Sequence, residues 1–373
     1  MAGVYIHIPF CKQACSYCDF HFSTLVKNKT EVIKSICKEI ELRKDYLGTK
    51  ELETIYFGGG TPSILSKNEL TEIFTSLQKY FTRSKDAEIT LECNPDDLTE
   101  SKLSEIKESG INRLSIGLQS FDKDELRWMN RAHTAEQSIA SVMMAQKAGF
   151  TNITIDLIYG SKFLSDEKWE ETLKTAIDLN VQHISAYNLT IEEKTKLGRL
   201  EIKGKEARVD EEKSSRQFLR MIELLGENGF EHYEISNFAK PGFIAVHNSN
   251  YWKGEKYVGI GPSAHSYDGA NRQWNIPNNN LYIKAISEEK SFFEIEQLTT
   301  ENRFNEYVLT GLRTKWGCDL NYLEKNFENK FSAHFKNEIK KFIPEFITEN
   351  NQKFTLTQKG KLMADKIAME LFV

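Results

Sequence analysis

The segment Val4–Cys18 reads VYIHIPFCKQACSYC and joins an apolar, β-branched stretch to three cysteines that lie within eight residues. Further strand-like stretches begin near Glu53, Glu88, Arg113, Ile153 and His183. Helical stretches separate them, and one opens on Ser66-Lys67-Asn68-Glu69, the signature of a capping box. Strands that alternate with helices predict an α/β fold with a parallel sheet. We therefore expect a partial (β/α)6 barrel of the TIM type.

Polar residues and glycines gather where the expected strands end. The cysteines follow the first strand, and Gly58-Gly59-Gly60-Thr61-Pro62 follows the second. Glu92 lies at the end of the third strand, Gln119 follows the fourth, and Asp156 lies late in the fifth. The carboxyl ends of parallel strands converge at one rim of a barrel, and sites are built there. The sequence thus predicts one shared pocket at this rim.

Composition narrows the class of protein. The chain has 373 residues, of which 40% are hydrophobic and 28% are charged, as in a folded globular protein. Its net charge of −5 argues against nucleic acid as the main partner. No apolar run approaches 18 residues, and the first residues lack the pattern of a signal peptide. We expect a cytoplasmic protein with no membrane span, and peripheral contact with a membrane stays open.

The pattern of elements suggests three parts. Residues 1–230 hold the expected barrel core. Residues 231–300 lose the alternation and become rich in Gly, Asn, His and aromatic residues, and we expect an extension there. Residues 301–373 turn helical again and end in a short strand and an amphipathic helix over Gln358–Leu371. We expect a small helical domain with a terminal hairpin, similar to a winged helix.

The three clustered cysteines indicate a metal site. In a reducing compartment, a tight group of cysteines points to metal binding or catalysis instead of disulfides. Thiolates at Cys11, Cys15 and Cys18 suit an iron–sulfur cluster or zinc. Zinc would need a fourth ligand, for which His7, Asp19 or His21 could serve. The spacing favours a cluster that has three protein ligands and therefore one open iron.

The motif Cys11-x3-Cys15-x2-Cys18 resembles the signature of the radical S-adenosylmethionine (SAM) superfamily. The resemblance implies a [4Fe–4S] cluster whose open iron is chelated by SAM. The glycine motif Gly58–Pro62 is similar to the one that approaches the methionine end of SAM in that superfamily. Glycines suit this task because a backbone without side chains can come close to a charged ligand.

Longer motifs resemble the oxygen-independent coproporphyrinogen III oxidase family. They are the segments Tyr5–Cys11, Gly117–Phe121, Asn130–His133 and Tyr233–Ala239. Position by position, the resemblance implies SAM contacts from nine residues: Tyr5, Tyr17, Gly59, Gly60, Thr61, Glu92, Gln119, Arg131 and Asp156. Carboxylates can accept hydrogen bonds from ribose or amine donors, and an arginine can pair with a carboxylate. Taken singly, each of these residues more often makes a structural hydrogen bond.

Two departures distinguish the chain from the decarboxylating enzymes of that family. Phe20 stands where those enzymes carry a further cysteine, and only ten residues precede Cys11 where they carry an N-terminal extension. Both features resemble the HemW-type haem chaperone branch. His247-Asn248-Ser249-Asn250-Tyr251-Trp252 is similar to the haem-binding signature of that branch. The resemblance implies haem contacts from His247, Asn248, Tyr251 and Trp252.

The chemistry of this motif is reasonable, because histidine is a common axial ligand of haem and aromatic rings pack on porphyrins. The alternative is a loop histidine with no ligand role. His265, in a glycine-rich segment, is a second candidate ligand or a loop residue.

Three hypotheses follow from the sequence. The first is a radical SAM protein that binds haem and delivers it to an apo-haemoprotein, with respiratory proteins among the possible acceptors. The second is an enzyme that decarboxylates coproporphyrinogen III to protoporphyrinogen IX, against which Phe20 argues. The third is a zinc-stabilised barrel that binds another ligand. No catalytic residue is assigned, and the sequence leaves open whether SAM is cleaved, the oligomeric state and the identity of the acceptor.

Overall fold

The computed structural model describes residues 2–373 and centres on a 12-stranded sheet. The strand order is β12-β11-β10-β9-β1-β2-β3-β4-β5-β6-β8-β7. Strands β1 to β6 are neighbours and run parallel, which confirms the expected partial (β/α)6 barrel. They are β1 (Ala2–Ile8), β2 (Glu51–Gly59), β3 (Thr82–Cys93), β4 (Arg113–Gln119), β5 (Ile153–Tyr159) and β6 (His183–Asn188).

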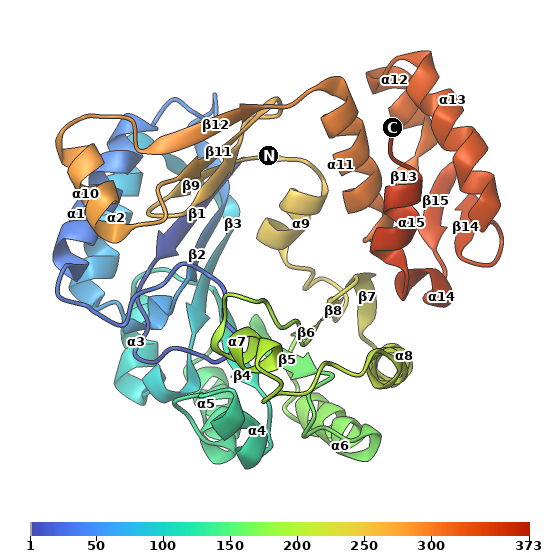
Figure 1. Cartoon of the computed structure of the whole chain (residues 1–373). Helices are drawn as coiled ribbons and strands as arrows, with labels where there is room; N and C mark the ends of the chain where they lie inside the picture. Colours follow the sequence, from blue (N-terminus) through green and yellow to red (C-terminus); the bar gives the residue numbers. More distant parts are fainter. Residues whose placement is uncertain (1) are drawn as a thin grey trace.

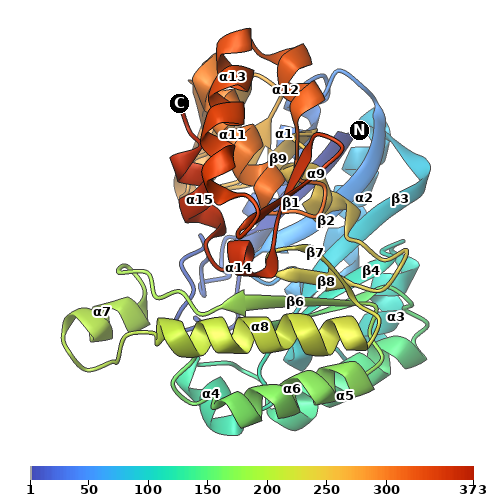
Figure 2. The same ribbon diagram turned by 90° about the vertical axis from the view of Figure 1, so that its right-hand side faces the viewer.

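Helices cover the outer face of this curved sheet (Figure 1). They are α1 (Lys29–Leu42), α2 (Lys67–Tyr80), α3 (Glu100–Glu108), α4 (Lys123–Trp128), α5 (Ala135–Lys147), α6 (Asp166–Asp178) and α8 (Glu211–Glu227). Helix α7 (Lys196–Ile202) projects beyond the barrel instead (Figure 2), and Leu197 N donates to Ser16 O of the cysteine loop at 3.0 Å. Figure 2 shows α6 and α8 side by side along the outside. Helix α2 begins with the expected capping box, in which Ser66 and Glu69 satisfy each other's backbone N–H groups.

Strand β1 shows why both faces of the sheet are buried. Val4, Ile6 and Ile8 are fully buried in the main apolar core. Tyr5 and His7 lie on the opposite face, because side chains alternate along a strand. A parallel sheet covered on both faces commonly has such a strand. Its inward side chains are polar here, and this gives the barrel an interior that can hold a ligand.

Short strands extend the barrel at both edges. Strands β7 (Glu231–Glu234) and β8 (Asn237–Ala239) follow β6, while β9 (Lys256–Ile260) pairs in parallel with β1. Antiparallel strands β10 (His265–Tyr267), β11 (Asn271–Asn275) and β12 (Phe293–Gln297) continue from β9. Two helices accompany them, α9 (Val246–Trp252) and α10 (Asn279–Ser287). These strands of three to five residues were not predicted, because they are too short to show a periodic pattern.

The C-terminal elements have a buried apolar cluster of their own, which includes Phe304, Phe331 and Phe354. A three-stranded sheet packs with helices, as expected of a domain similar to a winged helix. Its elements are α11 (Thr300–Leu312), β13 (Cys318–Asp319), α12 (Leu320–Asn326), α13 (Asn329–Glu338), β14 (Ile347–Asn350), β15 (Lys353–Leu356), α14 (Gln358–Lys361) and α15 (Ala364–Glu370).

Backbone hydrogen bonds attach these elements to the barrel edge. Lys315 N donates to Tyr233 O at 3.0 Å, and Ile235 N donates to Arg313 O at 3.1 Å. The residues after α11 therefore pair with β7. This connection holds the end of α11 against β7, which is the last strand at one edge of the 12-stranded sheet.

The prediction of one helix over Gln358–Leu371 was wrong. The chain turns at Leu362 and Met363, and two short helices replace the single one. Gly360 packs so closely that a Cβ would lie 2.0 Å from Phe346 O. The short α14 is thus fitted against the preceding loop, and Ile367 and Ala368 of α15 are buried in the C-terminal cluster. In residues 2–373, none of the helices has the length and apolar character to traverse a bilayer.

Candidate functional site

The three cysteines lie on a loop between β1 and α1, at the carboxyl ends of the barrel strands. Each thiol is partly buried and free. Thr61 Oγ1 donates to Cys11 Sγ at 3.4 Å, and Arg131 Nη1 donates to Cys15 Sγ at 3.2 Å. The loop is also held by Asn130, whose Nδ2 donates to Ala14 O at 2.7 Å. Two of the sulfurs therefore face hydrogen-bond donors that stabilise negative charge.

Burial makes the neutral form more favourable for two of these thiols, Cys11 and Cys18. Burial raises the pKa of Cys18 to about 12 and raises that of Cys11. A buried thiol loses its proton readily only when a positive charge such as a metal replaces it. Between residues 2 and 373, no group of three His, Cys, Asp or Glu side chains is already arranged to hold a metal ion.

The glycines after β2 lie where side chains would not fit. Gly59 has φ +106°, and a Cβ there would lie 2.5 Å from the His7 imidazole. At Gly58 a Cβ would lie 2.9 Å from the rings of both Tyr5 and Tyr56. Gly60 N donates to Ile8 O at 2.9 Å, so the loop is fastened to the end of β1. The glycine motif therefore keeps backbone, and not side chains, at the rim.

Two carboxylates lie inside the barrel beneath this loop. Glu92 accepts from Tyr56 OH at 2.7 Å and from Gly59 N at 3.2 Å, and Asp156 accepts from Ser115 Oγ at 3.3 Å. Burial raises the pKa of Glu92 to about 7 and that of Asp156 to about 6. A cationic ligand beside them would stabilise their charged forms. The barrel interior is therefore suited to a ligand that carries positive charge.

Arg131 connects the cysteine loop to the ends of β3 and β4. Besides Cys15, its guanidinium donates to Asn94 Oδ1 and to Gly117 O, each at 2.8 Å. Gln119 has a left-handed backbone with φ 68°, and its amide lies near Gly117, where a Cβ would be 2.9 Å from Nε2. Among residues 2–373, the buried Arg131 Nε has no hydrogen-bond partner. A buried donor of this kind has an unmet need for an acceptor, which a bound ligand could supply.

Sequence reasoning did not single out two residues of this site. Asn94 accepts from Arg131 and donates through Nδ2 to Thr61 Oγ1 at 3.4 Å. Tyr56 donates to Glu92. Both positions could have been predicted. Asn94 directly follows β3 at the rim, and Tyr56 lies two residues before Gly58, so that its side chain points to the same face of β2. Tyr17, which was predicted, packs in a small cluster with Met129, Ile158 and Leu189.

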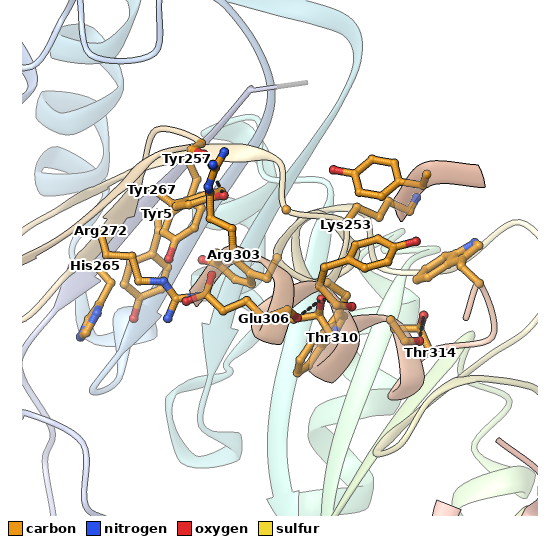
Figure 3. Close-up of a pocket in the computed structure, with 18 of the residues that line it drawn as sticks. Tyr5, Lys253, Tyr257, His265, Tyr267, Arg272, Arg303, Glu306, Thr310 and Thr314 are labelled. Carbon is orange, nitrogen blue, oxygen red and sulfur yellow. Dashed lines mark hydrogen bonds and ion pairs between the residues drawn. The ribbon is translucent and has the colours of Figure 1, made fainter. Parts of the chain in front are cut away.

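A cavity of about 980 Å³ lies between the barrel and the C-terminal elements (Figure 3). Its volume is at the upper end of the range for small-molecule sites. Strand β1, strands β9 to β11 and helix α11 all contribute to its wall. Ten aromatic side chains line it: Tyr5, Phe20, Tyr251, Trp252, Tyr257, Tyr267, Tyr307, Trp316, Tyr322 and Phe327. A cavity with this lining suits a large, flat and largely apolar ligand.

The predicted haem-binding motif is divided between this cavity and the barrel interior. Tyr251 and Trp252 line the cavity, whereas His247 is not among its lining residues. His247 is 2% exposed. Its Nδ1 lies 2.8 Å from Thr54 Oγ1, and its Nε2 lies 2.8 Å from Tyr251 OH. Both ring nitrogens are thus engaged, and iron ligation by His247 would require it to leave these partners. Asn248 is half-buried on the same helix.

Burial, together with the smaller effect of the nearby Arg113 charge, lowers the pKa of His247 to about 3. The imidazole is therefore neutral and stacks on Tyr56 with ring centroids 5.0 Å apart. Glu88 accepts hydrogen bonds from the backbone N–H groups of Val246 and His247, which fixes the start of α9. In this arrangement His247 holds α9 against β2 and β3.

Comparisons with known proteins agree with this arrangement. The profile of the Radical SAM superfamily matches residues 5–176, and that of the HemN C-terminal domain matches residues 298–363. A solved structure of coproporphyrinogen III oxidase (HemN) from Escherichia coli superposes with a TM-score of 0.85 at 23% identity. It covers 100% of this chain and 90% of its own. The barrel with its cysteine loop and C-terminal domain is therefore the fold of a radical SAM protein.

Curated relatives define the branch. "Heme chaperone HemW" of Bacillus subtilis is 32% identical over 371 residues, which are 98% of each chain. The protein of the same name from Lactococcus lactis is 34% identical and covers 96% of this chain and 94% of its own. That from Escherichia coli is 35% identical over 271 residues, 70% of this chain and 69% of its own. The chain belongs to the HemW family of radical SAM proteins.

Proposed function

We propose that this protein binds haem in the cavity between the barrel and the C-terminal elements and delivers it to apo-haemoproteins. The observation that carries the proposal is the similarity to HemW proteins over nearly the whole chain. This similarity extends over the barrel and the C-terminal elements, which together line the cavity. The aromatic lining supports it, because such side chains can cover the faces of a porphyrin.

The rim residues fit the cofactors that the superfamily implies. Cys11, Cys15 and Cys18 would hold a [4Fe–4S] cluster, because thiolates suit iron and two of these sulfurs face donors. When bound, the cluster would supply an open iron and a source of single electrons. The unpartnered Nε of Arg131 and the side-chain-free rim at Gly58 and Gly59 leave room for a polar ligand.

SAM suits the remaining residues of the rim and interior. Its sulfonium and amino groups are positive, and Glu92 and Asp156 are carboxylates whose pKa values are raised chiefly by burial, despite the nearby charge of Arg113. A further positive charge beside them would stabilise their charged forms. Arg131 would pair with its carboxylate. Tyr5, Tyr17, Gly60, Thr61 and Gln119 would complete the set as backbone or side-chain contacts.

Transfer of haem to another protein requires that the cavity be accessible from the surface. Phe20 is 69% exposed at the edge of the cavity, and Leu25 and Val26 of the same loop are also exposed. We propose that the acceptor approaches on this side, and respiratory haemoproteins are the class that we would test first. The compartment that we propose is the cytoplasm.

A second candidate function is oxidative decarboxylation of coproporphyrinogen III, because the fold is shared with HemN. Phe20 opposes it, since the residue lines the cavity with an apolar ring where the decarboxylating enzymes carry a cysteine. Replacement of a thiol by this ring removes any redox or acid–base role at that position.

The two functions are separated by paired assays on anaerobically reconstituted protein. Haem binding is followed by absorbance, and haem transfer by the appearance of a holo-haemoprotein acceptor. The same protein is then incubated with SAM, a reductant and coproporphyrinogen. We expect stoichiometric haem binding, transfer to the acceptor and no protoporphyrinogen. Absence of haem binding, or sustained formation of protoporphyrinogen, would contradict the proposed function.

A further inference from the structure

Three imidazoles line the cavity, and they differ in their hydrogen bonds. His7 Nδ1 lies 3.1 Å from Tyr5 OH, and His7 Nε2 lies 2.9 Å from His21 O. His21 Nε2 lies 2.9 Å from Asn279 Oδ1. His265 is exposed at the start of β10, and across residues 2–373 its ring nitrogens make no hydrogen bond. His265 is therefore the cavity imidazole whose nitrogen lone pair is most readily offered to a ligand.

His265 belongs to a face of the sheet that looks into the cavity. Residues that pair directly across neighbouring strands share a face. His265 pairs with Trp274, and Tyr267 pairs both with Arg272 and with Tyr257. The imidazole and the Trp274 ring have centroids 6.3 Å apart. Figure 3 shows His265, Arg272 and the two tyrosines gathered on one side of the cavity.

The opposite face of the same hairpin is fixed by a buried network. Arg43 donates to Gln273 Oε1 and to Asn275 Oδ1, each at 2.9 Å, and to Ser266 Oγ at 3.3 Å. These residues alternate with His265, Tyr267, Arg272 and Trp274 along the two strands, so they point away from the cavity. The network therefore holds the hairpin in the register that directs His265 into the cavity.

Cationic groups lie beside His265 and across from it. Arg272 forms an ion pair with Glu306 of α11 at 3.0 Å, and Arg303 lies one turn earlier on the same helix. Both arginines line the cavity. The only hydrogen bond of the Arg303 guanidinium within residues 2–373 is a long one of 3.4 Å to Thr300 Oγ1. Arginines recognise carboxylates, and bidentate pairs are the strongest of these contacts.

We propose that His265 is the axial ligand of the haem iron in this cavity and that Arg272 and Arg303 bind the haem propionates. This inference rests on the proposed haem-binding function and names the groups that perform it. It assigns the iron to the histidine that lies open in the cavity, and it assigns His247 to the support of α9. A propionate at Arg272 takes the place of Glu306, so the ion pair exchanges one carboxylate for another.

The first test is a haem titration of the full chain, prepared without oxygen, as wild type, His265→Ala, His265→Gly and His247→Ala. Absorbance gives the affinity, and electron paramagnetic resonance identifies the axial ligand. We expect His265→Ala to lose the histidine signature and to bind haem at least about tenfold more weakly. His265→Gly should regain that signature when imidazole is added, whereas His247→Ala should keep it. Unchanged ligation in His265→Ala would overturn the inference.

The second test separates the ligand from the charges with metal-free protoporphyrin, which has propionates but no iron. We expect His265→Ala to bind it like the wild type and Arg272→Gln/Arg303→Gln to bind both porphyrins more weakly. Arg216→Gln is the matched control, because Arg216 pairs with Asp166 at 3.0 Å outside the cavity. Equal binding by the double variant would overturn the assignment of the propionates. Wild type that binds no haem would refute the proposed function itself.

Discussion

Glu39 and Arg43 form a buried pair whose disruption should be costly. Glu39 is fully buried on α1 and lies 2.9 Å from Arg43 Nε. It also accepts from Gly261 N at 2.7 Å, from Asn275 Nδ2 at 2.8 Å and from Tyr282 OH at 2.5 Å. Glu39→Gln keeps the shape but leaves the Arg43 charge buried and uncompensated. Breaking one partner of such a pair costs about 3–5 kcal/mol.

This cost can be converted into a melting temperature. With an unfolding entropy of about 2.1 cal/mol/K per residue, the whole chain has roughly 0.8 kcal/mol/K. We therefore expect Glu39→Gln to lower Tm by about 4–6 °C in a thermal scan. Hydrogen exchange should also accelerate in β10 and β11, because Arg43 and Glu39 hold that hairpin.

The matched control lies on the same helix. Glu41 pairs with Lys38 at 3.1 Å, and both side chains are about 40% exposed. Exposed pairs contribute at most about 1 kcal/mol, so Glu41→Gln should lower Tm by no more than about 1 °C. The double variant Glu39→Gln/Arg43→Met should recover part of the loss, since it removes the orphaned charge. Equal Tm values for Glu39→Gln and Glu41→Gln would refute the reasoning.

Three further predictions concern the rim. Cys15→Ala should abolish the iron–sulfur absorbance after anaerobic reconstitution but leave the circular dichroism of the metal-free protein unchanged; unfolding would instead identify the loop as structural. Gly59→Ala should cost about 1–3 kcal/mol and weaken SAM binding, because φ is +106° and the new Cβ meets His7. Gly48→Ala, with φ +71° and nothing within 4 Å, is its control in calorimetry. For Glu92, a folded-state pKa of about 7, above the ordinary 4.5, means that the native state binds a proton more tightly than the unfolded chain. The contribution of Glu92 to the stability of the metal-free protein should therefore fall by up to about 3 kcal/mol as pH rises from 4.5 to 7. Glu92→Gln should remove this contribution from unfolding curves measured across the range, and the smaller slope that remains belongs in part to Asp156, whose pKa is raised to about 6.

The parallel core could be predicted because its signals are local. Each of the six strands is an apolar segment bounded by turn residues, and capping residues such as Ser66 and Thr99 mark where helices begin. The placement of the glycine loop and of Glu92 at one rim followed from the geometry of parallel strands alone. Short strands such as Asn237–Ala239 have too few residues for a period to be recognised.

Contacts between distant segments could not be predicted. The His247 ring bonds to Thr54, which lies 193 residues earlier in the chain. Because of this contact, the imidazole is buried and holds α9 against the sheet. The role of Asn94 could not be predicted for the same reason, since its bonds join Thr61 to Arg131 and it belongs to no recognisable motif. The cavity is formed by β1, β9 to β11 and α11. Contacts between segments far apart in the sequence bring these elements together, such as the pairing of β9 with β1 and the ion pair between Arg272 and Glu306.

The cysteine loop and the cavity share a wall, and this links the two halves of the proposed site. Phe20 and His21 line the cavity and directly follow Cys18 and Asp19. The backbone of His21 is fastened to His7 of β1, whose neighbour Tyr5 lines both the cavity and the barrel interior. A shift of the cysteine loop therefore moves one wall of the cavity. Because coupling between two sites is reciprocal, a ligand that orders this wall from the cavity side also changes the free energy of metal binding at the thiols.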